Sequence, residues 1–219
     1  MGDRHPVIFD MDGVIFDSER LLLKSWQMVA ARYGIEGIEE TLALCLGVSV
    51  DVSRQIYFDR YGPDFPLDDY KVETRALFRS WCPNGHPPVK EGAEALLSAL
   101  RQKGVPLALA TSTRSEVVMP ELAAAGLRDF FSVVICGDQI SRSKPAPDIF
   151  LAAAASLGAP PEDCFVIEDS FNGIRAARAA GTRPIMVPDV VPPDEEMAEK
   201  AEVILPSLAA AGDYLDRFL

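Results

Sequence analysis

The stretch that decides the fold is Pro6-Val7-Ile8-Phe9-Asp10-Met11-Asp12-Gly13-Val14, in which an apolar run ends in two closely spaced carboxylates. The run predicts a buried β-strand. At the end of a strand the chain can splay into a loop, so Asp10 and Asp12 need not point to opposite faces. Gly13 permits a sharp turn at this place. Two carboxylates this close bind a metal ion, share a proton or repel each other, and we interpret the pair as functional.

The order of apolar segments along the rest of the chain indicates an α/β fold. Strand-like runs lie at 105–110, 131–136, 164–167, 183–187 and 203–205. Helix-like stretches lie at 91–103, 114–125, 146–157 and 171–180. This alternation predicts a Rossmann-like parallel sheet with helices on both faces. Thr113 and Glu116 have the spacing of a capping box for the second of these helices.

Residues 17–84 interrupt the alternation with an all-helical pattern. The helical stretches lie at 17–33, 38–45, 49–61 and 67–81. The first strand precedes this segment and the other strands follow it. We therefore expect an inserted helical cap domain over 17–84 and a discontinuous core domain made of 1–16 and 85–219. Open α/β sheets bind ligands at the C-terminal edge of their strands, where such a cap would form a lid.

The composition is that of an acidic globular chain of 219 residues with a formal net charge of -12. This charge argues against nucleic acid or an anionic membrane as the main partner, because both attract basic surfaces. The four cysteines form no C-x-x-C pair, and free thiols are expected. We see no signal peptide before the first strand and no apolar run of the roughly 18 residues that span a membrane. We expect a cytoplasmic monomer.

Polar side chains follow the expected strands at the edge where their C-terminal ends meet. The first strand ends in Asp10 and Asp12, and the later strands are followed in order by Thr111-Ser112-Thr113, Lys144 and Glu168-Asp169. A phosphate dianion between ionised Asp10 and Asp169 would leave this site negative even with Lys144 beside it. A bound Mg²⁺ ion would offset that charge, and ligands that are all oxygen favour Mg²⁺ over zinc.

These residues, in this order, resemble the motifs of the haloacid dehalogenase superfamily. Its motifs are D-x-D-G, a Thr or Ser after a strand, a Lys and an acidic pair, which correspond here to Asp10-Met11-Asp12-Gly13, Thr111, Lys144 and Glu168-Asp169. The segments Lys144-Pro145-Ala146-Pro147-Asp148 and Ile167-Glu168-Asp169-Ser170 look like those of the β-phosphoglucomutase-like group with a helical cap. The resemblance covers most of the chain.

The resemblance implies three catalytic residues. Asp10 would be the nucleophile that forms an aspartyl-phosphate. Asp12 would protonate the leaving oxygen and later deprotonate water. Lys144 would offset negative charge on both the nucleophile and the phosphate. Asp12 also disfavours dehalogenation, because a departing halide needs no proton.

The resemblance also implies the binding residues. Thr111 and the N–H of Ser112 would hold the phosphoryl oxygens, and the full substrate-binding set is Thr111, Ser112, Thr113, Arg114 and Lys144. Arg114 either reads a distal phosphate or sugar group or is a solvated arginine of the first helical turn. Mg²⁺ would be held by Asp10, Asp169 and the backbone carbonyl of Asp12, with Glu168 as a further ligand or as support behind the ligands.

Two departures separate this chain from β-phosphoglucomutases. Those enzymes typically carry a His in the first cap helix, whereas residues 17–23 contain none, and an Arg after the cap G-V-S, where this chain has Val50. An apolar Val cannot anchor a second phosphate. We therefore favour a phosphatase acting on a small phosphorylated metabolite, a sugar or polyol phosphate. The alternatives are a phosphosugar mutase and a non-catalytic binding or regulatory protein on the same scaffold.

Overall fold

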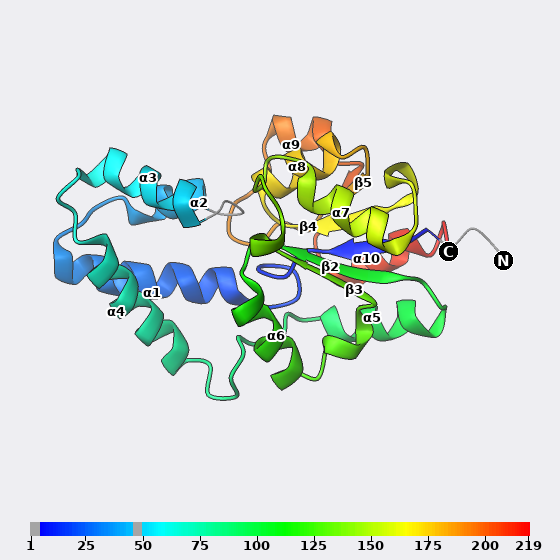
Figure 1. The fold of residues 1–219 in the computed structure, drawn as a ribbon, viewed down its shortest axis with the longest axis horizontal. Helices are drawn as coiled ribbons and strands as arrows, with labels where there is room; N and C mark the ends of the chain where they lie inside the picture. The colour runs from blue at the N-terminus through cyan, green and yellow to red at the C-terminus, as the bar shows by residue number, and fades with distance from the viewer. Residues whose placement is uncertain (1–4, 46–49) are drawn as a thin grey trace.

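The computed structural model describes residues 5–45 and 50–219, and these contain one six-stranded sheet (Figure 1). The strand order is β3-β2-β1-β4-β5-β6, and every neighbouring pair is parallel. The strands are β1 (Val7–Phe9), β2 (Leu107–Thr111), β3 (Val133–Cys136), β4 (Phe165–Glu168), β5 (Arg183–Met186) and β6 (Val203–Ile204). The predicted parallel α/β sheet is confirmed.

Strand β1 lies at the centre of the sheet, between β2 and β4. Val7 is in register with Leu107 on one side and with Phe165 on the other. All three residues of β1 are fully buried, as expected for a strand covered on both faces. This register places the chain after β1 between the ends of β2 and β4, where the polar residues of the candidate site lie.

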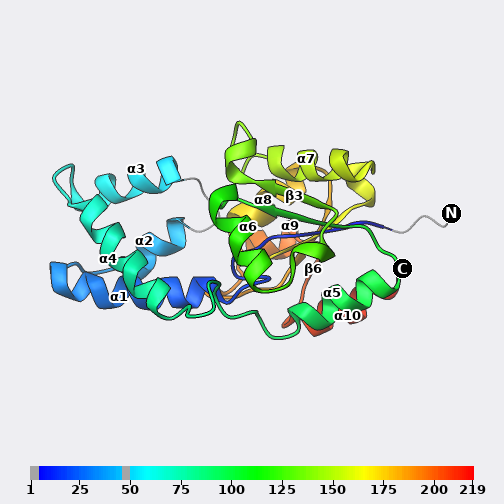
Figure 2. The same ribbon diagram turned by 60° about the horizontal axis from the view of Figure 1, so that its bottom comes forward.

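Helices cover both faces of the sheet (Figures 1 and 2). The hydrophobic cluster on one face includes residues of α5 (Ala93–Gln102), α6 (Ser115–Ala124) and α10 (Leu208–Leu215). The cluster on the other face includes residues of α7 (Asp148–Leu157) and α8 (Phe171–Ala179). The short helix α9 (Glu195–Lys200) packs through Met197 near β5, and 3-10 turns lie at Arg128–Phe130, Gly137–Gln139 and Pro161–Asp163.

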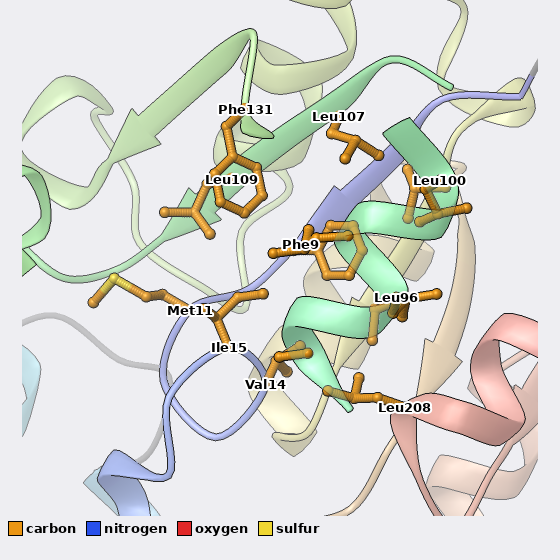
Figure 3. Packing of buried hydrophobic residues seen from close by; sticks show 14 of the residues in the cluster. Phe9, Met11, Val14, Ile15, Leu96, Leu100, Leu107, Leu109, Phe131 and Leu208 are labelled. Carbon is orange, nitrogen blue, oxygen red and sulfur yellow. The ribbon is translucent and has the colours of Figure 1, made fainter. Parts of the chain in front are cut away.

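Successive side chains of β1 point to opposite faces of the sheet, so the strand contributes to both hydrophobic clusters. Phe9 belongs to the cluster with α5 and α10, whereas Ile8 belongs to the cluster with α7 and α8. Figure 3 shows Phe9 packed among side chains of α5 and neighbouring segments, with Leu96 and Leu100 beside it. Burying a side chain of this size contributes about 1.5–3 kcal/mol. The strand that carries the acidic pair is therefore firmly anchored.

Four helices between β1 and α5 form a separate bundle, at the left of Figure 1: α1 (Ser18–Tyr33), α2 (Ile38–Cys45), α3 (Val50–Tyr61) and α4 (Leu67–Ser80). They share their own hydrophobic cluster, which includes Trp26, Tyr57 and Tyr70. The chain enters and leaves the bundle side by side, because the N–H of Asp17 donates to the carbonyl of Pro88 at 2.8 Å. The four predicted helical stretches are confirmed, and Leu46–Ser49 lie outside the described residues.

Two local features differ from the sequence predictions. Helix α6 begins at Ser115 after Arg114 with no side-chain cap, so the predicted capping box of Thr113 and Glu116 is wrong. The Thr113 hydroxyl donates instead to Asp12, far away in the sequence. Helix α10, which follows the cap residue Ser207, was not predicted.

Two further expectations concerned the cysteines and membrane-spanning helices. Cys136 and Cys164 are buried free thiols, as expected. None of the described helices combines the length and the apolar character needed to cross a membrane.

Candidate active site

The carboxylate of Asp10 lies at the centre of the C-terminal edge of the sheet. Its backbone N–H donates to the carbonyl of Ile167 at 3.0 Å, which extends the pairing of β1 with β4 by one residue. Directly afterwards Gly13, with φ of 79°, turns the chain. A Cβ on Gly13 would lie 2.2 Å from Oδ2 of Asp169. The turn therefore needs glycine both for its backbone angle and for the close approach of Asp169.

A buried ammonium group joins Asp10 to the neighbouring strand end. Nζ of Lys144 lies 2.6 Å from Oδ1 of Asp10 and 2.6 Å from Oε1 of Glu168. Lys144 is only 2% exposed, and its ammonium also lies over the ring of Phe150. Burial alone would lower the pKa of Lys144, but the two carboxylates outweigh it and raise that pKa. The lysine is therefore charged and fixed at the base of the site.

Both carboxylate oxygens of Glu168 accept hydrogen bonds from neighbouring donors. Oε1 accepts from Lys144, while Oε2 accepts from the N–H groups of Asp169 and Ser170 at 2.9 and 2.8 Å and from the Ser170 hydroxyl at 3.0 Å. A Cβ on Gly173 would lie 1.8 Å from Glu168. The first turn of α8 thus leaves room for this carboxylate, which holds Lys144 in place.

Three carboxylates meet beside this lysine. One oxygen each of Asp10, Glu168 and Asp169 lie within 4.8 Å of one another, and all three residues are buried. Burial raises the pKa of Asp10 to about 8, which Lys144 opposes and which Glu168 and Asp12 reinforce. Burial likewise raises the pKa of Asp169 well above its ordinary value, with repulsion from Glu168 adding to it. One lysine does not balance this charge, so the cluster fits an oxygen-liganded cation.

Asp12 has different surroundings, although it is only two residues from Asp10. Its Oδ1 accepts from the hydroxyl of Ser18 at 2.8 Å, and its Oδ2 accepts from the hydroxyl of Thr113 at 2.7 Å. Ser18 begins helix α1, whereas Thr113 follows β2. Hydroxyl groups from two separate segments therefore orient this partly exposed carboxylate, and no lysine contacts it in the described part of the chain.

The predicted hydroxyl loop lies on the wall of the same cavity. Oγ1 of Thr111 accepts from the N–H of Thr113 at 3.1 Å, so Thr111 shapes the loop as well as facing the site. Ser112 and Arg114 also line the cavity. The Arg114 side chain is largely exposed and lies 3.4 Å from Glu116. The structure thus brings all nine residues of the predicted site to one place.

The cavity has a volume of about 730 Å³ and is shared by the sheet edge and the helical bundle. The bundle supplies lining residues from all four of its helices: Ser18, Glu19, Leu22, Trp26, Leu42, Cys45, Ser53, Lys71, Thr74, Arg75, Phe78 and Arg79. The reacting edge of the sheet is therefore covered by side chains of the bundle.

Sequence reasoning missed several residues of this site. Glu19 is 8% exposed, and its Oε2 has no hydrogen-bond partner among the described residues. An acid in the first turn of a helix is usually explained by the helix dipole, so the position of Glu19 carries no distinct signal of a functional role. Lys90 lies in the second connection to the bundle, where its Nζ contacts the carbonyl of Gly13 and lies 2.9 Å from Oδ1 of Asp189. Lys71, Arg75 and Arg79 of α4 could have been found from the sequence, because they are spaced four residues apart and so lie on one face of a helix.

Comparisons with known proteins agree with the motifs. The sequence pattern of haloacid dehalogenase-like hydrolases matches residues 7–187. A Drosophila melanogaster protein named "Probable pseudouridine-5'-phosphatase" is 36% identical over 215 residues, which cover 94% of this chain and 90% of that protein. A phosphorylated carbohydrates phosphatase of Thermotoga maritima is 33% identical over 183 residues, which cover 82% of each chain.

A solved structure agrees as well. CbbY from Rhodobacter sphaeroides, crystallised with phosphate, superposes with a TM-score of 0.76 at 28% identity, covering 97% of this chain and 99% of that one. The predicted motifs, the parallel sheet and these relatives lead to one conclusion. The chain belongs to the haloacid dehalogenase-like hydrolases, in the group that resembles β-phosphoglucomutase.

Proposed function

We propose that this protein is a Mg²⁺-dependent phosphatase that hydrolyses a small phosphorylated metabolite, a sugar or polyol phosphate, through an aspartyl-phosphate. The observation that carries the proposal is the pair Asp10 and Asp12, which share one cavity but have different partners. The phosphatase names of the relatives support the same reaction class.

Asp10 is suited to be the nucleophile. Lys144 holds its Oδ1 at 2.6 Å, which leaves Oδ2 for the substrate. In the first step a carboxylate oxygen of Asp10 bonds to phosphorus while the bond from phosphorus to the leaving oxygen breaks. In the second step water attacks phosphorus and releases inorganic phosphate, and the Asp10 carboxylate is regenerated. Positioning and charge stabilisation dominate catalysis of this kind.

Asp12 is suited to move the protons. In its acid form it donates a proton to the leaving oxygen, and its carboxylate then accepts a proton from the attacking water. Ser18 and Thr113 fix its orientation for both steps. Thr111 and Ser112 lie where phosphoryl oxygens can be held.

Asp10, Asp169 and the backbone carbonyl of Asp12 would hold the metal ion. Bound Mg²⁺ supplies positive charge beside the phosphoryl oxygens. The donors already on both oxygens of Glu168 favour a supporting role for this residue, which fixes Lys144 rather than binding the ion directly.

We further propose that residues 17–84 act as the cap and that 1–16 and 85–219 form the core. The cavity is lined by residues of both parts. We also propose a monomer as the working unit, because each part has a hydrophobic core of its own. Hydrolysis is favoured over phosphosugar transfer because the start of α1 supplies Ser18, Glu19 and Leu22 to the cavity and no imidazole. The second argument against a mutase was the missing Arg after the cap G-V-S. It cannot be compared with the structure, because Gly47 to Ser49 lie outside the described residues and the side chain of Val50 is not described.

A phosphate-release screen over sugar, polyol, nucleotide and short organic phosphates tests the proposal. We expect Mg²⁺-dependent turnover that Asp10→Asn abolishes, while Asp64→Asn, in an exposed turn, leaves it unchanged. Glucose 1-phosphate with its bisphosphate separates hydrolysis, which yields free phosphate, from mutase activity, which yields glucose 6-phosphate. Absence of turnover across the whole panel would overturn the proposal.

A further inference from the structure

Helix α4 carries a row of cations along the wall of the cavity. Lys71, Arg75 and Arg79 are four residues apart, a spacing that places side chains on one face of a helix, and all three line the cavity. At about 1.5 Å of rise per residue, the row extends roughly 12 Å along the helix. Figures 1 and 2 show α4 running from the far end of the bundle back toward the core, on the side of α6. We call these three residues the α4 cation row.

The α4 cation row differs from the paired arginines of the bundle, because among the described residues no carboxylate oxygen lies within 4.0 Å of its charged nitrogens, although Glu121 is near enough to feel the charge of Arg79. Arg54 lies 2.7 Å from Asp68, and Arg32 lies 3.3 Å from Glu73. Within the described residues, no member of the row donates a hydrogen bond or lies in an ion pair. Lys71 has only the ring of Tyr57 beneath its ammonium. Other cations of the bundle are held in short ion pairs, whereas these three line the cavity without one.

Leaving these cations unpaired has an electrostatic cost. Burial lowers the pKa of Lys71, and repulsion from Arg54 and Arg75 lowers it further. Attraction to Asp68 opposes this repulsion, but the pKa of Lys71 is still lowered overall. Arg75 and Arg79 are exposed, so their guanidinium groups are available to a ligand that enters the cavity.

The two ends of the cavity therefore have opposite character. The sheet edge presents Asp10, Asp12 and Asp169, which fit a cation and the phosphoryl group that accompanies it. The cations that the bundle brings to the cavity all come from α4, whereas Glu19 of α1 lies on the acidic side, where Asp12 and Asp10 repel it. Arginine forms its strongest hydrogen bonds with phosphate and carboxylate groups, where both partners are charged.

We propose that the α4 cation row binds a second anionic group, a phosphate or a carboxylate, on the part of the substrate that leaves. The inference rests on the proposed phosphatase reaction, which places the scissile phosphate at Asp10. It narrows the substrate class to doubly anionic phosphoesters, such as sugar bisphosphates or phosphorylated sugar acids. The row acts in substrate binding and specificity and does not contact the reacting atoms.

The first test measures binding without turnover, in the Asp10→Asn protein with Mg²⁺ and by titration calorimetry. Glycerol 3-phosphate and 3-phosphoglycerate differ only in a terminal hydroxymethyl or carboxylate group, and fructose 6-phosphate and fructose 1,6-bisphosphate test a second phosphate. We expect the doubly anionic member of at least one pair to bind about tenfold tighter or more. The carboxylate pair and the phosphate pair together tell which anion the row prefers.

The second test removes the charges. Arg75→Gln and Arg79→Gln, each added to Asp10→Asn, should erase most of that preference. The matched control Arg32→Gln, which loses a paired arginine outside the cavity, should keep it. Equal affinity within both pairs, or an equal loss in Arg75→Gln for singly and doubly charged ligands, would overturn the inference.

The third test uses the active chain and separates the two proposals. Arg75→Gln should lose about tenfold more kcat/KM with the preferred doubly anionic substrate than with its singly charged counterpart. If the binding preference is found but no phosphate ester is turned over, the proposed phosphatase function fails while the anion site stands. If esters are turned over without any preference, the α4 inference alone fails.

Discussion

Replacing Lys144 by Met tests the physical account of the site most directly. The side chain is 2% exposed, and its ammonium lies 2.6 Å from a carboxylate oxygen of both Asp10 and Glu168. Methionine has a similar length, and its apolar end suits the ring of Phe150, over which the Lys144 ammonium lies. The substitution therefore removes the charge with little change in volume and leaves two buried carboxylates facing each other.

The expected cost follows from that burial. Removing one partner of a buried ion pair destabilises a protein by about 3–5 kcal/mol, because a charge stays buried without compensation. For a chain of this length, about 2–4 °C of Tm corresponds to each kcal/mol, which predicts a loss of roughly 6–20 °C. Asp10 can escape part of this cost by taking up a proton. The loss of stability should therefore be smaller at pH 5 than at pH 8. At pH 8 the carboxyl of Asp10 is ionised in the unfolded chain, so keeping it protonated in the folded state costs more free energy.

Thermal and urea unfolding, without Mg²⁺ and at pH 5 and 8, measure this loss. Lys103→Met is the matched control, because Lys103 pairs with Asp216 at 2.5 Å on the surface and such pairs contribute about 1 kcal/mol or less. Adding Glu168→Gln to Lys144→Met should recover stability without restoring phosphatase activity. If Lys144→Met is no less stable than Lys103→Met, the reasoning about the buried charges is refuted.

Three more predictions follow from neighbouring groups. Gly173→Ala should lower stability by about 1–3 kcal/mol and abolish turnover, because its Cβ would displace Glu168; Gly212→Ala, a helical glycine with more room, should be far milder in unfolding assays. Burial and Asp12 raise the pKa of Glu121 to about 7 against the opposing charge of Arg79, so its ionisation destabilises the fold as pH rises from 4.5 to 7. Glu121→Gln should therefore raise Tm at pH 8 and leave it unchanged at pH 4; the opposite order would contradict this. Because burial raises the pKa of Asp10 to about 8, Mg²⁺ affinity measured by calorimetry should increase from pH 6 to pH 8 with release of protons, and a constant affinity would contradict the argument.

The sheet could be predicted because its signals are local and repeated. Each central strand is an apolar run that ends at or just before a polar residue, and parallel connections bring all such ends to one edge. Asp10, Thr111 and Glu168 were expected at this edge from the convergence of the strand ends, and the structure shows β2 and β4 flanking β1. The order of motifs along the chain was therefore sufficient to identify the residues that meet.

The partners of those residues could not be predicted in the same way. Thr113 has the sequence spacing of a helix cap, yet its hydroxyl donates to Asp12, because the loop after β2 passes beside the loop after β1. Ser18 has the same acceptor from the opposite side. A hydroxyl group can satisfy a local or a distant acceptor at similar cost, and only the packing of the two loops decides between them.

The difference between the two aspartates is set by these surroundings and not by their own chemistry. Asp10 lies beside a buried ammonium and two further carboxylates, and burial raises its pKa while Glu168 and Asp12 add to this effect and Lys144 opposes it, so a bound cation would favour its ionised form. Asp12 is partly exposed and, within residues 5–45 and 50–219, its carboxylate is held by neutral hydroxyl groups, which can accompany it in either protonation state. A nucleophile must stay ionised while it attacks, whereas a proton carrier must change its state twice in each cycle. Because Ser18 opens the first helix of the bundle, the group that orients the proton carrier also belongs to the part of the chain that covers the substrate.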